Sequence, residues 1–339
     1  MHFALKRTFE KMSLLQRSFN TVKTFSSYHW SKWTGSTQHW GKPISVSIEP
    51  TTACNLGCPE CPSGLKKFSR PTGKIDLGNF NKWTSQLKNY VSYITFYFQG
   101  EPYLNPGFLE MVTIASEKNI FTATSTNAHF LNDEKAKATV LSGLKKLIIS
   151  VDGTTQEVYE QYRVNGSLEK VIKGTRNIVK WKKELRSKYP KVVFQFLVVK
   201  PNEHQIEDVK KLGEELGVDK VVFKSAQVYD YENGNSLIPE TEKYSRYKKR
   251  SDGRYELKNK LADHCWRLWS SCVITWDGKV VPCCFDKDAK HQLGDLNKSD
   301  FDTIWNGAAY QAFRSKLLNS RKEIDICKNC SEGTKVWVN

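Results

Sequence analysis

The chain has 339 residues and 39% hydrophobic content, enough for one large domain or for a barrel with a smaller unit. Its nine cysteines are too few for a disulfide scaffold, and their grouping indicates metal binding in a reducing compartment, so we expect a cytoplasmic protein. The net charge of +16 favours an anionic partner or substrate. Nucleic acid is not favoured, because no RNA-binding aromatic signature or helix-turn-helix pattern is found.

Residues 1–42 form a basic leader with a single acid, Glu10. Apolar residues recur in it at helical spacing, namely Leu5, Phe9, Met12, Leu15, Phe19 and Val22. Three interpretations remain open: a helix packed on the barrel, which we favour, a membrane-surface helix, or an organellar presequence. No apolar run reaches the roughly 20 residues of a membrane-spanning helix.

From residue 43, short β-branched runs alternate with longer amphipathic stretches. The predicted strands are Ile44–Ile48, Tyr93–Phe98, Phe121–Ser125, Leu147–Val151, Val192–Val199 and Val221–Lys224. The predicted helices are Leu77–Tyr90, Phe108–Lys118, Asp133–Leu144, Leu168–Leu185 and His204–Leu216. Such a series predicts a parallel sheet with helices outside. We therefore expect an α/β fold, an open partial (β/α)6 TIM-like barrel with its chemistry at the C-terminal strand ends.

Three cysteines follow the first predicted strand. Cys54, Cys58 and Cys61 are spaced C-x3-C-x2-C, and the next cysteine is Cys265. Four-cysteine coordination is the ordinary arrangement for a cubane iron–sulfur cluster, so three thiolates leave one iron open for another ligand. The alternatives are buried free thiols or a zinc knuckle, although zinc usually takes four closed ligands and no fourth lies nearby.

Further motifs stand at the ends of the next strands. The second ends Tyr97-Phe-Gln-Gly-Glu-Pro102, the third Thr124-Ser-Thr-Asn-Ala128 and the fourth Ser150-Val-Asp-Gly153, and Arg163 follows them. Each has an ordinary alternative, since Gly-Glu-Pro and Asp-Gly are common turns and an arginine often forms a surface salt bridge.

Together with the cysteine loop, these motifs resemble the radical S-adenosylmethionine (SAM) superfamily. The resemblance implies that Cys54, Cys58 and Cys61 hold a 4Fe-4S cluster whose open iron binds SAM. It also implies a set of SAM-binding residues, namely Gln99, Gly100, Glu101, Ser125, Asn127, Ser150, Asp152 and Arg163. Two positions depart from the family: Gln99 replaces the first glycine of its Gly-Gly-Glu motif, and Ala128 replaces the glycine of its Thr-Asn-Gly stretch.

Residues 229–260 break the alternation, being polar and basic, and we interpret them as a linker or a substrate-facing arm. The expected division of the chain is therefore a leader at 1–42, a radical SAM core at 43–228, the linker, and an auxiliary domain at 261–339.

The C-terminal region contains Cys265, then Gly278 and Cys283, and later Cys327 and Cys330. Asp277-Gly278 lies between two β-branched runs, Val273–Trp276 and Lys279–Val281, and predicts a β-hairpin. The spacing resembles the auxiliary-cluster unit of the SPASM and twitch branch of the family. That resemblance implies one auxiliary 4Fe-4S cluster on these four cysteines, in a small β-hairpin-plus-helix domain. Cys272 and Cys284 are interpreted as packed thiols, and a zinc ribbon is the alternative for the region.

The resemblance implies an oxidoreductase that cleaves SAM to a 5'-deoxyadenosyl radical and abstracts a substrate hydrogen. We expect a two-electron oxidation or modification of a small molecule or peptide, with a reductant such as flavodoxin or ferredoxin. Such an oxidation needs a base, and Asp286 is the candidate, although a carboxylate there also suits a turn cap. The alternative is a non-catalytic iron–sulfur or zinc protein that relays electrons or binds nucleic acid through its basic surface.

Overall fold

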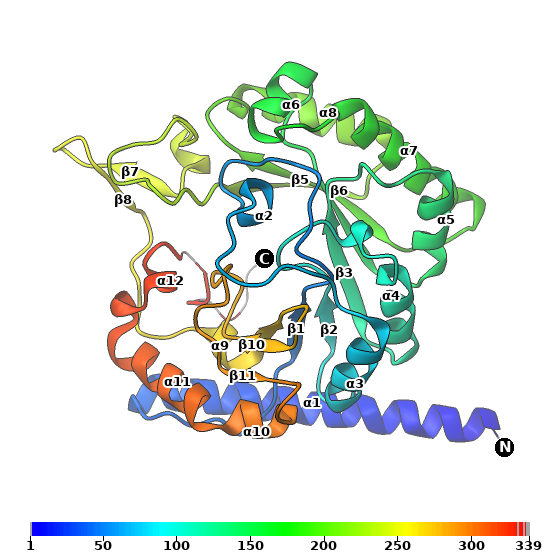
Figure 1. Cartoon of the computed structure of the whole chain (residues 1–339), viewed down its shortest axis with the longest axis vertical. Helices are drawn as coiled ribbons and strands as arrows, with labels where there is room; N and C mark the ends of the chain where they lie inside the picture. Colours follow the sequence, from blue (N-terminus) through cyan, green and yellow to red (C-terminus); the bar gives the residue numbers. More distant parts are fainter. Residues whose placement is uncertain (1, 331, 335, 337–339) are drawn as a thin grey trace.

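A nine-stranded sheet forms the centre of the protein (Figure 1). The computed structural model describes residues 2–330, 332–334 and 336, with side chains from Leu14 onward. Along the sheet the strand order is β11-β10-β9-β1-β2-β3-β4-β5-β6. The first six strands in the chain are β1 (Ser45–Ile48), β2 (Tyr93–Thr95), β3 (Phe121–Thr126), β4 (Lys146–Ser150), β5 (Lys191–Val198) and β6 (Lys220–Ser225).

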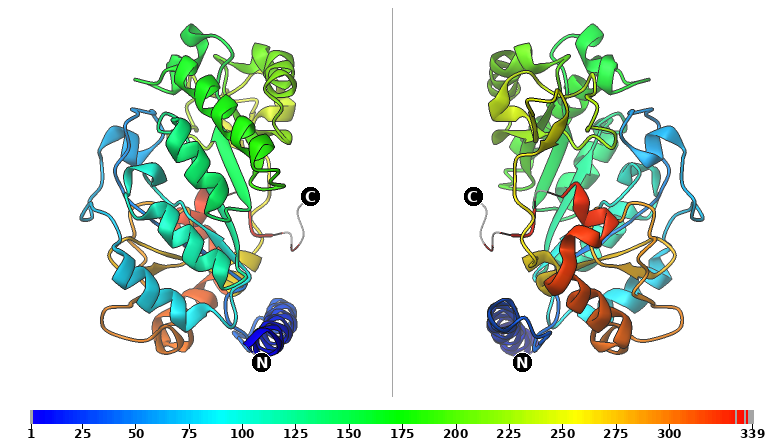
Figure 2. Two further views of the ribbon diagram at one scale, coloured as in Figure 1. Left: turned by 90° about the vertical axis from the view of Figure 1, so that its right-hand side faces the viewer. Right: turned by 90° about the vertical axis from the view of Figure 1, so that its left-hand side faces the viewer.

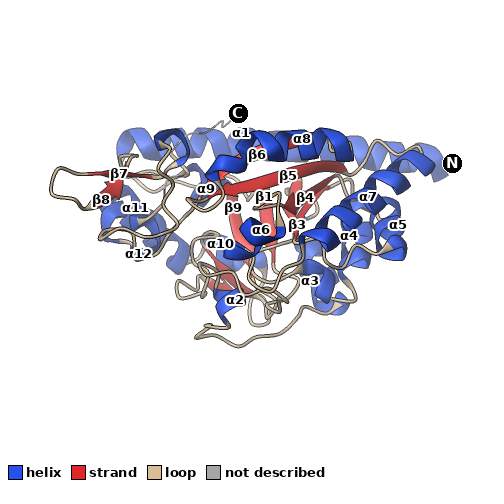
Figure 3. Cartoon of the chain, turned by 90° about the horizontal axis from the view of Figure 1, so that it is seen from above, coloured by secondary structure: helices blue, strands red, loops and turns tan. Residues whose placement is uncertain are grey.

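These six strands pair in parallel in chain order, which confirms the predicted α/β fold with a partial barrel. Seen from above, the strands curve inside a layer of helices (Figure 3). The helices between and after them are α3 (Leu77–Leu87), α4 (Phe108–Glu117), α5 (Asp133–Leu141), α6 (Gln156–Tyr162), α7 (Leu168–Glu184) and α8 (Ile206–Leu216). Short 3-10 turns lie at Pro102–Leu104, Glu203–Gln205, Glu242–Tyr244 and Arg321–Glu323.

Local sequence accounts for where these helices begin and which face they bury. The side chains of Asp76, Asn132, Thr155 and Ser167 each accept a hydrogen bond from the backbone amide three residues later, at the start of a helix. The apolar helix faces pack against the outward-facing strand residues, forming one core that includes Phe80, Val112, Val171, Phe96 and Ile149.

The predicted C-terminal hairpin continues the barrel sheet. β9 (Ser271–Ile274) pairs in parallel with β1, from Ser45↔Ser271 to Ile48↔Ile274. β10 (Lys279–Val281) then pairs antiparallel with β9, and β11 (Gly294–Asp295) with β10. The turn needs its glycine, because Gly278 has a φ of +84° and an added Cβ would lie 2.7 Å from the Trp83 ring.

Helices flank this hairpin in the chain. α9 (Trp266–Ser270) precedes it, and α10 (Phe301–Asn306), α11 (Ala308–Ser320) and α12 (Asp325–Lys328) follow it. The segment interpreted as a linker contains a separate two-stranded sheet, β7 (Tyr247–Lys249) with β8 (Tyr255–Leu257). It is fastened to the barrel, since the hydroxyl of Tyr247 bonds both the carbonyl of Val228 and the side chain of Asn329.

The leader forms helix α1 (His2–Thr34), which lies across the end of the barrel where the strands begin (Figures 1 and 2). The side chain of Arg17 donates to the carbonyl oxygens of Lys88, Lys118 and Asn119, which precede β2 and β3. The helix therefore lies against the barrel, but Leu15, Phe19 and Val22 are exposed; the side chains of Leu5, Phe9 and Met12 lie outside the described residues. In the part of the chain that the structure covers, no helix has the length and apolarity to cross a membrane.

Candidate functional site

The three clustered cysteines lie in the loop after β1, at the C-terminal end of the barrel strands. Cys58 is buried, and Cys54 and Cys61 are half-buried among apolar neighbours that include Leu56. The loop turns back through the short helix α2 (Pro62–Leu65), where a Cβ on Gly64 would come within 2.6 Å of the Cys58 nitrogen. The chain therefore needs glycine here to fold tightly around the cysteines.

The end of β2 holds this loop from one side. The amide of Gly100 donates to Oγ of Ser63 at 2.8 Å, and the amide of Glu101 donates to the carbonyl of Ala53 at 2.8 Å. Gly100 has a φ of +75°, and a Cβ there would lie 2.2 Å from the Thr51 carbonyl oxygen. These contacts explain why a glycine is needed at this turn, five residues after the end of β2.

Glu101 directs its carboxylate toward the end of β3. Its two oxygens accept hydrogen bonds from Oγ1 of Thr126 at 2.7 Å and from the amide of Asn127 at 2.8 Å. Burial raises the pKa of Glu101 to about 7, although these hydrogen bonds oppose the rise. The side chain of Asn127 in turn donates to Asn55 of the cysteine loop at 2.8 Å. The ends of β2 and β3 and the loop are thus linked.

Ala128 stands where the family pattern has the glycine of its Thr-Asn-Gly stretch. Ala128 has a φ of +62°, the left-handed region that glycine adopts most easily. It is 1% exposed, and Oγ1 of Thr126 accepts a hydrogen bond from its amide at 3.0 Å. The backbone therefore takes the turn that a glycine would favour without having one.

Asp152 and Arg163 hold the loop from the other side. The fully buried carboxylate of Asp152 accepts from Nε of Arg163 at 2.5 Å and from the amide of Leu197 at 2.7 Å. Nη1 of Arg163 lies 3.7 Å from Sγ of Cys58. Burial alone would lower the pKa of Arg163, but the carboxylate of Asp152 outweighs it, and the pKa is raised. A fixed positive charge therefore faces the cysteine loop.

The two other sequence-predicted polar residues lie on neighbouring strands. Ser125 stands near the end of β3, opposite Ile148 of β4, and Ser150 ends β4 with 6% exposure. Gln99 is 8% exposed, and its Oε1 lies 3.9 Å from Sγ of Cys61. The structure thus brings the predicted SAM-binding residues to one end of the strands, around the cysteine loop.

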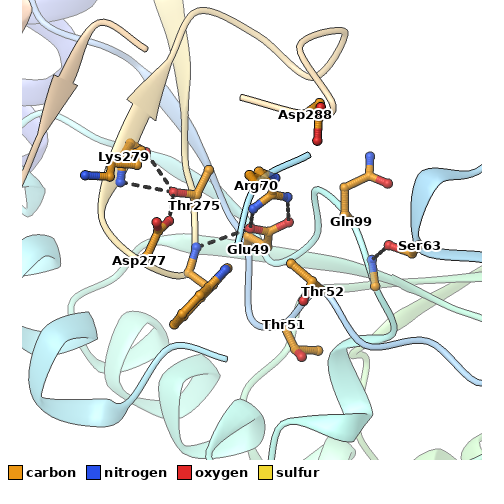
Figure 4. A network of polar contacts seen from close by, with 12 residues as sticks. Glu49, Thr51, Thr52, Ser63, Arg70, Gln99, Thr275, Asp277, Lys279 and Asp288 are labelled. Atoms are coloured by element: carbon orange, nitrogen blue, oxygen red, sulfur yellow. Dashed lines mark hydrogen bonds and ion pairs between the residues drawn. The ribbon is translucent and has the colours of Figure 1, made fainter. Parts of the chain in front are cut away.

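Sequence reasoning missed a buried ion pair that joins this loop to the C-terminal hairpin (Figure 4). The guanidinium of Arg70 donates to both carboxylate oxygens of Glu49, at 2.8 and 2.5 Å, and the amide of Trp276 donates to Glu49 at 3.2 Å. Burial raises the pKa of Glu49, while Arg70 counteracts this. In the sequence, the position of Glu49 directly after the first strand could have marked it as a candidate site residue. That position does not identify Arg70 as its partner.

Four cysteines line a small buried cavity beside the hairpin: Cys265, Cys283, Cys327 and Cys330. These are the four that the resemblance to the SPASM and twitch branch implies as auxiliary ligands. The guanidinium of Arg321 also lines the cavity, and its Nη2 lies 3.6 Å from Sγ of Cys330. A Cβ on Gly333 would lie 2.2 Å from Sγ of Cys265, so glycine lets the returning chain approach this cysteine closely.

The remaining cysteines lie elsewhere. Cys272 is 1% exposed and belongs to the main hydrophobic core, and Cys284 packs beside Phe98 and Val281. Neither lines the four-cysteine cavity.

Asp286, the candidate base, is 1% exposed and uses its two carboxylate oxygens within its own loop. They accept hydrogen bonds from the amides of Lys290 and His291, each at 2.9 Å. This is the geometry of a turn cap, so we do not assign a proton transfer to it.

Both cysteine groups are compatible with iron–sulfur clusters. Among the described residues, no three His, Cys, Asp or Glu side chains converge on a single metal ion. In a cubane cluster each thiolate binds a different iron, so its ligands surround the cluster and do not meet at one point. Burial raises the pKa of Cys54 to about 11 and that of Cys327 to about 12, so metal binding at neutral pH must release their protons.

A cavity of about 640 Å³ lies beside the cysteine loop. Cys54 and Ser63 line it together with two exposed cations, Lys66 and Lys74.

Comparisons with known proteins agree with this geometry. Residues 48–213 match the family model described as the Radical SAM superfamily, and residues 265–331 match SPASM, an iron–sulfur cluster-binding domain. The first match runs from the last residue of β1 through most of α8, and the second covers the hairpin with all four cysteines of the buried cavity.

Individual relatives align over most of the chain. The tungsten-containing aldehyde ferredoxin oxidoreductase cofactor-modifying protein of Pyrococcus furiosus is 26% identical. The alignment covers 84% of this chain and 86% of the relative's length. PqqA peptide cyclase of Rhodopseudomonas palustris is 24% identical, in an alignment that covers 80% of this chain and 73% of the relative's length. The crystal structure of BtrN in complex with AdoMet and 2-DOIA has a similar fold, with a TM-score of 0.53, 19% identity and coverage of 86% and 94%.

Proposed function

We propose a function from the premise that this chain belongs to the radical SAM superfamily and carries a C-terminal SPASM domain. It is a radical SAM SPASM enzyme, which sets aside the non-catalytic alternative. Its cofactors are SAM, the radical SAM 4Fe-4S cluster and auxiliary iron–sulfur clusters of the SPASM region. When bound, SAM and its cluster supply a 5'-deoxyadenosyl radical that abstracts a hydrogen atom from the substrate.

The observation that carries the proposed site is the convergence of four strand ends on the three-cysteine loop. In this proposal Cys54, Cys58 and Cys61 hold the first cluster. The backbone of Gln99 and Gly100 and the polar groups of Ser125, Asn127 and Ser150 surround SAM. Glu101 and Asp152 position neighbouring residues and do not bind SAM themselves in this proposal, because protein donors already occupy their carboxylate oxygens.

Arg163 is the proposed partner of the SAM carboxylate. Its Nε is held by Asp152, and its Nη1 faces Cys58, which leaves Nη2 for a further acceptor. A buried, permanently charged guanidinium is suited to binding a carboxylate that must lie close to the cluster.

For the SPASM region we propose one auxiliary 4Fe-4S cluster on Cys265, Cys283, Cys327 and Cys330. The support is that all four line one cavity, while Cys272 and Cys284 lie outside it. Arg321 partly compensates the negative charge of the thiolates there.

The proposed reaction is a two-electron oxidation or another modification of a small molecule or a peptide. One relative is a cofactor-modifying protein and another a peptide cyclase, so both substrate classes occur among similar proteins. We further propose an acidic reductant such as flavodoxin or ferredoxin, which would approach through the cavity lined by Lys66 and Lys74.

Formation of 5'-deoxyadenosine tests this proposal. Anaerobically reconstituted protein with dithionite is expected to convert SAM to methionine and 5'-deoxyadenosine, and Cys58→Ala is expected to abolish the conversion. Cys272→Ala is the matched control, because it removes a buried thiol that lies away from both cysteine groups. Conversion by Cys58→Ala at the wild-type rate would refute the site.

A further inference from the structure

Helix α1 turns its polar face toward the barrel. The buried side chains on this helix are mostly polar: Arg17, Asn20, Thr24, Ser27, Tyr28 and Ser31. Hydrogen bonds hold the helix in this orientation. Nδ2 of Asn20 donates to the carbonyl of Lys42 at 3.0 Å, and Nη1 of Arg17 donates to the carbonyl of Asn119 at 2.6 Å. From Leu14 onward, where its side chains are described, the helix is therefore fixed to the barrel while its large aliphatic side chains stay exposed.

The opposite face is apolar and open to solvent. Its members are Leu15, Phe19, Val22, Trp30 and Trp33, with exposures of 71%, 62%, 60%, 46% and 80%. At the pitch of an α-helix these five positions fall within an arc of about 80°. We call these five residues the α1 stripe. An amphipathic helix on a globular protein normally buries such a stripe, so α1 has the reverse orientation.

Aromatic side chains gather at the C-terminal end of the stripe. The rings of Trp30 and Trp33 lie 5.9 Å apart, and Trp40, which is 48% exposed, lies 6.3 Å from Trp30. Indole rings favour the boundary between lipid headgroups and acyl chains, because they combine an apolar body with a polar N–H group.

The charge around the stripe is positive. From Lys11 to Ile48 the sequence has no acidic residue, and Lys23 and Lys32 are exposed on α1. A hollow of about 330 Å³ beside the stripe is lined by Phe19, Lys23, Trp40 and other residues of α1 and the barrel. Apolar and aromatic residues flanked by lysine on one helix are the pattern of an interfacial amphipathic helix that prefers anionic lipid.

We propose that α1 docks this enzyme on the surface of an anionic lipid bilayer, with the α1 stripe inserted among the headgroups. Arg17 joins α1 to the loops that precede β2 and β3, whereas the cysteine loop follows β1 at the other end of the strands. Docking through α1 therefore leaves the mouth of the barrel facing away from the bilayer, open to substrate and reductant.

A second copy of this chain is a less suitable occupant of the stripe. Each copy carries a net charge of +16, and pairing two α1 helices would bring two acid-free, basic segments together. Like charges repel at such a contact, whereas an anionic lipid surface attracts the same segment.

Vesicle flotation of the full-length, reconstituted protein tests the proposal. The probes are vesicles of phosphatidylcholine alone and vesicles containing phosphatidylglycerol. The test variant is the double change Phe19→Ser with Trp33→Ser, which alters only exposed side chains. The matched control is Leu141→Ser, which changes a 64% exposed leucine on α5. Light scattering after size exclusion reports the oligomeric state of each protein.

We expect wild type and Leu141→Ser to bind the anionic vesicles, and the double variant to bind about tenfold more weakly or less. Bromine-labelled lipid should quench tryptophan fluorescence in wild type, and less so in the double variant. Equal binding by the double variant, or equal binding of wild type to phosphatidylcholine alone, would overturn the proposal. So would a dimer that the double change converts to monomer in a protein that binds no vesicles.

Discussion

The guanidinium of Arg163 lies between Asp152 and Cys58, bonded to the first at 2.5 Å and 3.7 Å from the sulfur of the second. One side chain thus connects the end of β4 to the cysteine loop. This geometry uses two different nitrogens held in one plane by the guanidinium, whereas an ammonium group offers its donors from a single nitrogen.

Arg163→Lys is therefore expected to lower the rate of 5'-deoxyadenosine formation by about tenfold or more and to raise the SAM concentration needed for half-maximal rate. The measurement is product formation under anaerobic conditions over a series of SAM concentrations. Arg176→Lys, an exposed position on α7, serves as the control and should leave both values unchanged. A wild-type SAM dependence in Arg163→Lys would contradict the role proposed for this residue.

The buried carboxylate of Glu101 should make stability depend on pH. Its pKa is raised to about 7, so the folded protein binds this proton more tightly than the unfolded chain. The free energy of unfolding should then fall as pH rises toward 7, by about 1 kcal/mol between pH 6 and pH 8 from this group. Glu101→Gln cannot ionise, so its stability relative to wild type should increase over the same interval.

Urea denaturation of both proteins at the two pH values measures this difference. Glu110→Gln, an exposed position on α4, should be offset from wild type by the same amount at pH 6 and pH 8. A constant offset for Glu101→Gln would show that Glu101 does not titrate in this range.

Iron analysis tests the number of clusters. One SAM-binding cluster and one auxiliary cluster correspond to about eight irons per chain. Cys327→Ala should reduce the iron bound after reconstitution, because Cys327 lines the four-cysteine cavity, whereas Cys284→Ala should not. If Cys284→Ala loses as much iron as Cys327→Ala, the ligand set proposed here is wrong.

The proposed docking of the reductant at the cavity beside the cysteine loop can be tested by reversing the charges there. Reversing two charges with Lys66→Glu and Lys74→Glu should slow 5'-deoxyadenosine formation when flavodoxin is the reductant. With dithionite, a small reductant that needs no docking surface, the rate should stay at the wild-type value. Lys211→Glu on α8 is the control for a general loss of positive charge. If the double change slowed 5'-deoxyadenosine formation equally with both reductants, it would have damaged the cluster or SAM site, and the docking proposal would be wrong.

Much of the barrel could be predicted because its signals are local. Strand periodicity, the spacing of Cys54, Cys58 and Cys61, and the Gly-Glu pair at 100 and 101 each act within a few residues. Contacts between distant segments gave no such signal. The pairing of Glu49 with Arg70 depends on how two loops fold over each other, and that of β1 with β9 on strands more than two hundred residues apart.

Periodicity also did not identify which face of the leader helix would be buried. The spacing of Leu15, Phe19 and Val22 correctly indicated a helix. The barrel, however, presents carbonyl oxygens at the end where the helix lies, so Arg17 and Asn20 face inward and the apolar residues remain outside. The chemistry of the receiving surface determined the orientation, and no pattern within the leader contains that information.

The parallel pairing of β1 with β9 also has a consequence for biosynthesis. Ser45 to Ile48 leave the ribosome early, yet one edge of this strand lacks its partner until Ser271 to Ile274 have been translated. The cysteine loop is attached directly to that strand, and Arg70 and Glu49 fasten it to Trp276 of the same late segment. We therefore expect the first metal centre to mature only after this late segment has emerged, and nascent chains arrested before residue 271 to bind iron poorly.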